Sequence, residues 1–157
     1  MTADALAGIP GCLACDLTAG RVPLPGGILL RAGSWVVEHC VGALGLGTLV
    51  VKPVRHVVHV ADLTGPEAAD MGPLLRRVSA TVTAVTAPEQ VYVCLWSHAG
   101  GVPGHLHFVV QPVDRATVVR YDAFGPRLQV ALGEEGRVPE AGEVERVCDR
   151  LRGALGG

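Results

Sequence analysis

The order of apolar and polar positions along the chain predicts short strands on either side of one long helix. Short runs of β-branched and other apolar residues, bounded by turn residues, are typical of strands. Five runs have this pattern: residues 28–31, 35–39, 48–51, 91–96 and 105–110. The residues Ala32-Gly33-Ser34 separate the first two runs and indicate a hairpin turn.

The segment from Thr64 to about Val85 has the pattern of an amphipathic helix. Thr64 and Glu67 have the spacing of a capping box, and Pro66 stands in the first turn, where a missing N–H group costs nothing. Apolar residues then recur at helical spacing and form one face that we expect to pack on the sheet. These residues are Met71, Leu74, Leu75, Val78, Val82 and Val85.

Strands in runs with one long helix between them favour an α+β fold with a five-stranded, mainly antiparallel sheet. A C-terminal amphipathic helix is predicted for 140–155, and a short strand for 117–120. The length of 157 residues suits one domain. We expect residues 1–11 to form a flexible leader, 12–113 the domain, and 114–157 a C-terminal extension that contains the helix.

Composition narrows the class of protein. The net charge is −2 and no basic stripe is present, which disfavours binding to a nucleic-acid backbone. No stretch approaches the roughly 18 uncharged apolar residues of a membrane span. The N-terminus has no basic region followed by an apolar run, so no signal peptide is predicted. Five cysteines, an odd number, then indicate a reducing compartment, and we expect a cytoplasmic protein.

Cys12 and Cys15 lie three positions apart in a segment, 12–27, that is rich in turn residues. At this spacing both sulfurs can point to one place, which suits two corners of a tetrahedral zinc site. A redox pair would normally open a helix after a strand, and no strand is predicted before Cys12. A pair of small buried residues is the remaining alternative, and the spacing alone leaves it open.

His105 and His107 stand in the last predicted strand. Because side chains alternate along a strand, both should project from one face, about 6–7 Å apart. Two imidazoles on one face of an apolar strand are costly unless each is hydrogen-bonded or ligated. The pair therefore favours a functional site over two ordinary core residues. His56 follows the predicted strand 48–51, where a histidine is usually a solvated loop residue. It would have a role only as the missing ligand of the zinc site.

Together these segments resemble the histidine triad (HIT) superfamily of nucleotide hydrolases and transferases. The chain is particularly similar to actinobacterial HIT proteins and to the galactose-1-phosphate uridylyltransferase branch. The resemblance covers about residues 12–112. It rests on the Cys-x-x-Cys pair, Gly47-Thr48-Leu49-Val50-Val51 followed by Pro53-x-Arg55-His56, Leu63-Thr64 before the long helix, Ala99-Gly100, and His105-x-His107 with Pro112.

The resemblance implies a zinc site made by Cys12, Cys15, His56 and His105. Four protein ligands would form a closed tetrahedron, which is a structural and not a catalytic arrangement. It also implies that His107 is the nucleophile, which attacks the α-phosphorus and forms a nucleotidyl-histidine intermediate. Water or an acceptor phosphate would then receive the nucleotidyl group. Imidazole suits this role because it is nucleophilic when neutral and leaves well when protonated.

Two positions depart from the family pattern. Val109 stands where the third histidine of the triad is expected, and valine cannot donate a hydrogen bond to a phosphate. Gly101 stands where many hydrolases have Gln or Ser. Backbone N–H groups of Gly100 and Gly101 could hold phosphate oxygens. Ser97 and His98 are further candidates for substrate binding, with exposed loop residues as the alternative.

The resemblance implies a nucleotide phosphate hydrolase or nucleotidyltransferase with a structural zinc ion. Its partner would be a small-molecule nucleotide or phosphate ester, and the resemblance implies a homodimer. A second hypothesis, favoured by Val109 and Gly101, is a divergent HIT-fold protein that binds nucleotide without turnover or catalyses another reaction. A third is an interaction domain that zinc stabilises.

Overall fold

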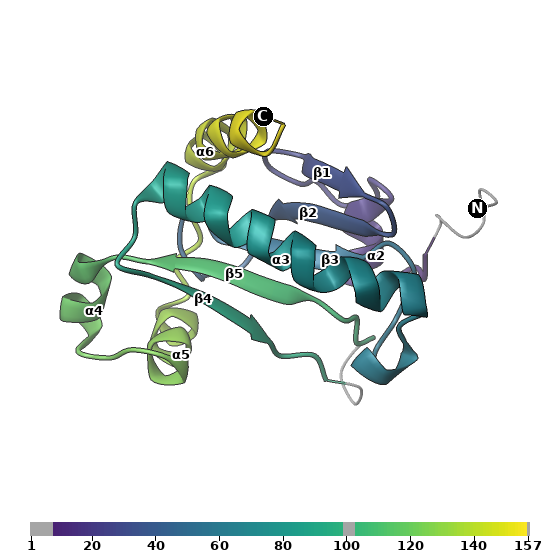
Figure 1. The fold of residues 1–157 in the computed structure, drawn as a ribbon. Helices are drawn as coiled ribbons and strands as arrows, with labels where there is room; N and C mark the ends of the chain where they lie inside the picture. Colours follow the sequence, from purple (N-terminus) through teal and green to yellow (C-terminus); the bar gives the residue numbers. More distant parts are fainter. Residues whose placement is uncertain (1–7, 99–102, 157) are drawn as a thin grey trace.

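The computed structural model describes residues 8–98 and 103–156 and contains a five-stranded antiparallel sheet with the strand order β1-β2-β3-β5-β4 (Figure 1). Its strands are β1 (Ile28–Ala32), β2 (Trp35–His39), β3 (Leu49–Pro53), β4 (Gln90–Leu95) and β5 (Phe108–Val113). The helices are α2 (Leu13–Thr18), the short 3₁₀ helix η1 (Val60–Asp62), α3 (Gly65–Thr86), α4 (Arg115–Tyr121), α5 (Pro126–Glu135) and α6 (Ala141–Leu155). The predicted α+β class and antiparallel sheet are confirmed.

The two faces of the sheet have different roles. Helix α3 crosses one face and α6 lies beside it, next to β1 (Figure 1). The main core lies under these helices and contains Trp35, Val37, Leu49 and Val51 from β2 and β3. Because side chains alternate along a strand, the neighbouring positions of β2 and β3 project to the opposite face, where α2 lies. That second face carries the candidate functional site.

Helix α3 has the predicted start and the predicted buried face. The Thr64 hydroxyl accepts a hydrogen bond from Glu67 N at 3.3 Å, and Thr64 N donates to Glu67 Oε2 at 2.8 Å, which completes the capping box. Leu74, Val78 and Val82 are buried. The other apolar residues of the predicted face, Met71, Leu75 and Val85, are partly buried against the same core.

Replacing Thr64 with alanine tests this helix start. The hydroxyl that accepts from Glu67 N is lost, and an N-cap of this kind contributes about 1 kcal/mol to the free energy of unfolding. We expect the melting temperature to fall by roughly 2–4 °C, which circular dichroism can measure. A control, Thr83→Ala, removes an exposed hydroxyl that donates to the Ser79 carbonyl within the helix, and its effect should be smaller.

Three predicted elements were wrong in type or extent. Strand β5 begins at Phe108, so His105 and His107 precede the strand and do not belong to it. The Leu106 amide donates to the Val57 carbonyl at 2.6 Å, which joins this segment to the chain after β3. Residues 117–120 lie in α4 instead of a strand, because Asp114 caps that helix by accepting from Thr117 N at 2.7 Å.

The third difference is the segment 12–27, which contains helix α2 and not only turns. Cys12 is the residue before this six-residue helix and Cys15 lies in its first turn. Helix α5 was not predicted, whereas α6 closely matches the predicted C-terminal helix. Among the described residues, no helix is long and apolar enough to cross a membrane.

Candidate metal site and adjoining pocket

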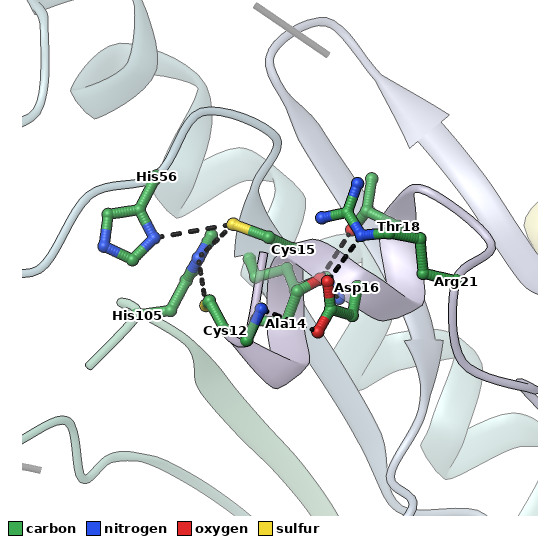
Figure 2. Close-up of polar contacts among 10 residues, drawn as sticks. Cys12, Ala14, Cys15, Asp16, Thr18, Arg21, His56 and His105 are labelled. Atoms are coloured by element: carbon green, nitrogen blue, oxygen red, sulfur yellow. Dashed lines mark hydrogen bonds and ion pairs between the residues drawn. The ribbon is translucent and has the colours of Figure 1, made fainter. Parts of the chain in front are cut away.

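Four predicted metal ligands come together from three separate segments of the chain. Cys12 and Cys15 come from the start of α2, while His56 follows β3 and His105 precedes β5 (Figure 2). One ligand atom from each residue lies within 4.8 Å of the other three. Three of the four residues, both cysteines and His105, are buried. The cluster could therefore hold a metal ion away from solvent.

The distances inside the cluster fit a tetrahedral metal ion. Cys15 Sγ lies 3.4 Å from His56 Nδ1 and 3.5 Å from His105 Nδ1, and Cys12 Sγ lies 3.6 Å from His105 Nδ1. Zinc–sulfur bonds of about 2.3 Å and zinc–nitrogen bonds of about 2.0–2.1 Å at tetrahedral angles place such atoms roughly 3.5 Å apart. The side chains already stand at the spacing that a shared Zn²⁺ ion requires.

A backbone carbonyl orients the imidazole of His105. Its Nε2 donates a hydrogen bond to the Pro53 carbonyl at 3.0 Å, since a carbonyl can only accept. The Nδ1 atom, which faces both cysteines, therefore has its lone pair available in the neutral ring. Burial is the main cause that lowers the pKa of His105 to about 4, so the ring is neutral near pH 7.

The lowered pKa of His105 predicts how stability depends on pH. The unfolded chain takes up this proton near pH 6.5 and the folded chain only near pH 4, so acid favours unfolding. The contribution is present above pH 6.5 and is lost as the pH falls toward 4. Protons also compete with a metal for the same nitrogen and sulfur atoms. Thermal melts and metal analysis from pH 7.5 downward should show both declining together; constant values down to pH 4.5 would contradict this.

A pocket of about 350 Å³ adjoins the candidate metal site on the same face of the sheet. Cys12 and His105 belong to its wall, and so does His107. Helix α2 contributes one side, and Trp96, Ser97 and His98 after β4 contribute another. The candidate metal site thus forms part of the wall of a cavity that a small ligand could enter.

His107 is held with one ring nitrogen available. Its Nδ1 lies 2.8 Å from the His105 carbonyl, and because a carbonyl only accepts, Nδ1 carries the proton. In the neutral ring the Nε2 atom then has a lone pair and can act as a nucleophile or base. His105 therefore contributes its side chain to the metal cluster and its carbonyl to the orientation of His107.

The predicted substrate-binding residues have different positions. Ser97 and His98 both line the pocket; Ser97 Oγ donates to the Val58 carbonyl at 3.2 Å, and His98 is exposed. Gly100 and Gly101 lie outside the described residues, as does most of the predicted leader. At Gly104 a Cβ atom would lie only 2.6 Å from the His98 carbonyl oxygen, so glycine is required where these two chain segments meet.

A buried ion pair in the pocket wall was not predicted from the sequence. Lys52 Nζ donates to Glu38 Oε1 at 2.6 Å and to the Ala14 carbonyl of α2 at 2.7 Å. The Lys52 side chain is 0% exposed and that of Glu38 is 3% exposed. Burial raises the pKa of Glu38, and Lys52 opposes that shift. The available signal was a charged residue within each of two apolar strands, Val36-Val37-Glu38 and Val50-Val51-Lys52.

Helix α5 lies beside the pocket, and none of its residues lines the pocket wall. The Trp96 indole donates to Gln129 Oε1 of α5 at 3.1 Å, and Gln129 Nε2 donates to Gln111 Oε1 at 3.0 Å. Val109, at the position of the third triad histidine, is 5% exposed on the same strand as Gln111. Helix α5 is therefore linked through Trp96 to the rim of the pocket.

Comparison with solved structures identifies the fold. A histidine triad nucleotide-binding protein described as hypothetical, from Sulfolobus tokodaii strain7, has a TM-score of 0.71 at 16% identity, covering 92% of each chain. A zinc-bound histidine triad family protein from Mycobacterium smegmatis has a TM-score of 0.67 at 18% identity, covering 92% of this chain and 93% of its own. A diadenosine triphosphate hydrolase from Plasmodium falciparum has a TM-score of 0.63 at 10% identity, and the match covers 86% of this chain and 79% of the hydrolase chain.

Sequence comparison adds no assignment, because no protein-family profile and no curated protein matches the chain. These structural matches extend over most of this chain, and two of the three proteins are described as histidine triad proteins. The antiparallel sheet, the long helix and the cysteine–histidine cluster had pointed to the same kind of protein. This chain has the fold of the histidine triad proteins.

Proposed function

We propose that this protein is a nucleotide phosphate hydrolase or nucleotidyltransferase that acts through His107 and contains a structural zinc ion. The orientation of His107 carries the proposal. Its Nδ1 is bonded to a carbonyl, so that in the neutral ring the lone pair is on Nε2, and His107 lines a pocket of about 350 Å³. The similarity to a diadenosine triphosphate hydrolase supports a nucleotide as the substrate.

In the proposed reaction, His107 Nε2 attacks the α-phosphorus of the substrate. A phosphorus–nitrogen bond forms while the bond from phosphorus to the leaving oxygen breaks. Water or an acceptor phosphate then attacks phosphorus, and His107 leaves as the neutral ring once the incoming group has lost its proton. Val109 cannot give a proton to the first leaving group. Substrates that release phosphate or diphosphate, which leave without prior protonation, should therefore react faster than those that release an alcohol.

Zinc is assigned to Cys12, Cys15, His56 and His105. Four protein ligands at tetrahedral spacing favour a structural ion with no open coordination position. Bound there, the ion would join α2 to the segments that follow β3 and precede β5. It would therefore support the wall of the pocket next to His107.

A second function, nucleotide binding without turnover, is favoured by Val109. This position has an apolar, buried side chain where the reaction would benefit from a hydrogen-bond donor. The pocket and His107 would then serve recognition only. A homodimer, which rests on the resemblance, and a cytoplasmic location, which rests on the odd number of cysteines, are further proposals; sedimentation and cell fractionation test them.

Incubation with adenosine phosphoramidate, diadenosine triphosphate and UDP-glucose separates the two functions. Turnover, together with a nucleotidyl adduct on His107 in quenched samples analysed by mass spectrometry, is expected for an enzyme. Tight binding of the same compounds without product or adduct would contradict the enzymatic function and favour the second.

A further inference from the structure

The charged end of Lys52 is completely buried in β3. The Lys52 side chain is 0% exposed, and the Glu38 carboxylate that pairs with it is 3% exposed. Taking two charges out of water costs free energy that their attraction need not recover, so a buried ion pair is weak evidence of a stabilising role. Both residues belong to the pocket wall, but a ligand in the pocket cannot reach an ammonium group that has no exposed surface. The pair therefore requires an explanation other than ligand binding.

The backbone of α2 is the further partner of this ion pair. Lys52 Nζ donates to Glu38 Oε1 at 2.6 Å and to Ala14 O at 2.7 Å. Glu38 stands opposite Val50 on the neighbouring strand, two residues before Lys52 and on the same face of the sheet. The carboxylate thus fixes the lysine from β2, and the lysine joins α2 to β3.

Ala14 lies between the two cysteines of the candidate metal site (Figure 2). Cys12 is the residue before α2, and Cys15 lies in its first turn. A helix of six residues is too short to be stable by itself. Thr18 Oγ1 also donates to Ala14 O, at 3.0 Å, but this bond lies within the helix and does not connect it to the sheet. The place of both sulfur atoms therefore depends on how α2 is joined to the sheet.

Two consecutive residues of β3 hold metal ligands from opposite sides. Lys52 bonds the turn that carries the cysteines. Pro53, the next residue, accepts a hydrogen bond from His105 Nε2 at 3.0 Å through its carbonyl. An ion that must gather ligands from separate segments binds more tightly when those segments are already in place. The end of β3 thus supplies a bond to each of two segments that the ion would connect.

We propose that Lys52 is a positioning residue for the metal site, which holds the first turn of α2 so that Cys12 and Cys15 face the two histidines before the ion binds. Glu38 serves as the counter-ion that keeps the lysine in place. The inference rests on the zinc ion of the proposed function and adds a residue outside the four ligands that sets the zinc affinity. Bonds of this kind around a metal site contribute about 10- to 100-fold to metal affinity.

The zinc affinity of two matched variants tests this role, measured on the full chain by competition with a chromophoric chelator. Glu38→Gln keeps the lysine, whose Nζ still has hydrogens to donate to Ala14 O. Glu38→Gln/Lys52→Met removes that donor without leaving a buried charge unpaired, so the double variant should fold. It should bind zinc about 10- to 100-fold more weakly than Glu38→Gln. If Glu38→Gln alone does not fold, the wild type takes its place in the comparison.

Co²⁺ in place of zinc gives a spectroscopic readout, since its visible absorption reports sulfur ligands and tetrahedral geometry. The double variant should need more cobalt than Glu38→Gln to develop these bands, but the spectra at saturation should agree. Agreement at saturation would support a role in placing the ligands, because all four would still bind. A different saturated spectrum would overturn this role, because the substitution would then have changed the ligands themselves.

Two control variants separate the tether from other effects. Thr18→Val removes the bond to Ala14 O that lies within α2, and Val78→Ala destabilises the core at a fully buried position of α3. Both should keep the zinc affinity of the wild type. Affinities of Glu38→Gln and the double variant within about threefold of each other, or an equal loss in Val78→Ala, would overturn the inference.

The proposed function and this inference can fail separately. A wild-type chain that binds no zinc would overturn the zinc assignment and the role of Lys52 together. A wild-type chain that binds zinc as tightly as the double variant would overturn the role of Lys52 alone. Product formation and labelling of His107 report the proposed reaction, and neither measurement enters the comparison of zinc affinities.

Discussion

Replacing Cys12 with serine is expected to release the bound metal and to lower the melting temperature by about 10 °C or more. Cys12 Sγ lies 3.6 Å from His105 Nδ1 and is fully buried. A serine hydroxyl is a poor zinc ligand, and the remaining three ligands would hold the ion weakly. Because the ligand atoms come from three segments, the free energy of metal binding contributes directly to the free energy of unfolding.

Metal analysis and thermal melts of protein purified without added zinc provide the measurement. About one zinc ion per chain is expected in the wild type and much less in Cys12→Ser. Wild-type protein stripped by a chelator should melt close to the variant, which separates loss of the metal from a local defect of serine. Zinc retained at the wild-type level in Cys12→Ser would refute the assignment.

Cys40→Ser is the matched control. Cys40 is half-buried and lines the same pocket, but it lies outside the cluster of four. Its sulfur accepts a hydrogen bond from Gly42 N at 3.3 Å, which a serine oxygen can also accept. This variant should keep its metal and most of its stability. A general sensitivity of the protein to loss of any thiol would appear in both variants.

The sheet and the two longest helices were predictable because their signals are local. Runs of β-branched residues marked the strands, and the Thr64–Glu67 capping box marked the start of α3. Helix α2 has six residues, which is too short for a periodic pattern to appear. The start of α4 did have a signal, Asp114 three residues before Thr117, but the β-branched pair Val118-Val119 favoured a strand.

The functional site was predictable to different degrees. Its metal ligands were proposed from a resemblance that linked segments far apart in the sequence, and the structure brings those segments together. The geometric argument for His105 and His107 was wrong, because both residues precede β5 and do not alternate along a strand. The pairing of Glu38 with Lys52 depends on the register of β2 and β3, which no local pattern specifies.

The candidate metal site and the pocket are built partly from the same residues, so a change at the metal site should also affect ligand binding. His105 directs its side chain to the cysteines and its carbonyl to His107, and Cys12 belongs to the pocket wall. Loss of the metal should therefore weaken ligand binding as well as stability. The reverse does not hold, because His107 makes no contact that the metal cluster requires: its Nδ1 bonds only the backbone carbonyl of His105 among the described residues. A substitution of His107 can therefore test the proposed reaction without removing the metal.

Replacing His107 with alanine is expected to reduce turnover by at least about 10³-fold and to abolish the nucleotidyl adduct. The pocket loses the Nε2 lone pair that we propose attacks phosphorus, whereas the four candidate metal ligands and the Glu38–Lys52 pair remain. Zinc content should therefore equal that of the wild type. Binding of a nucleoside monophosphate should persist with at most a modest loss. Steady-state rates and mass spectrometry of quenched reactions measure the two effects.

His59→Ala serves as the control, since His59 is an exposed histidine near η1 and does not line the pocket. Its turnover should match that of the wild type. Undiminished turnover in His107→Ala, or an adduct on another residue such as His98, would contradict the role of His107. A loss of zinc in His107→Ala would point to a structural role instead, because a nucleophile that only faces the substrate has no part in holding the metal. Normal metal content with no adduct therefore separates catalysis by His107 from support of the fold.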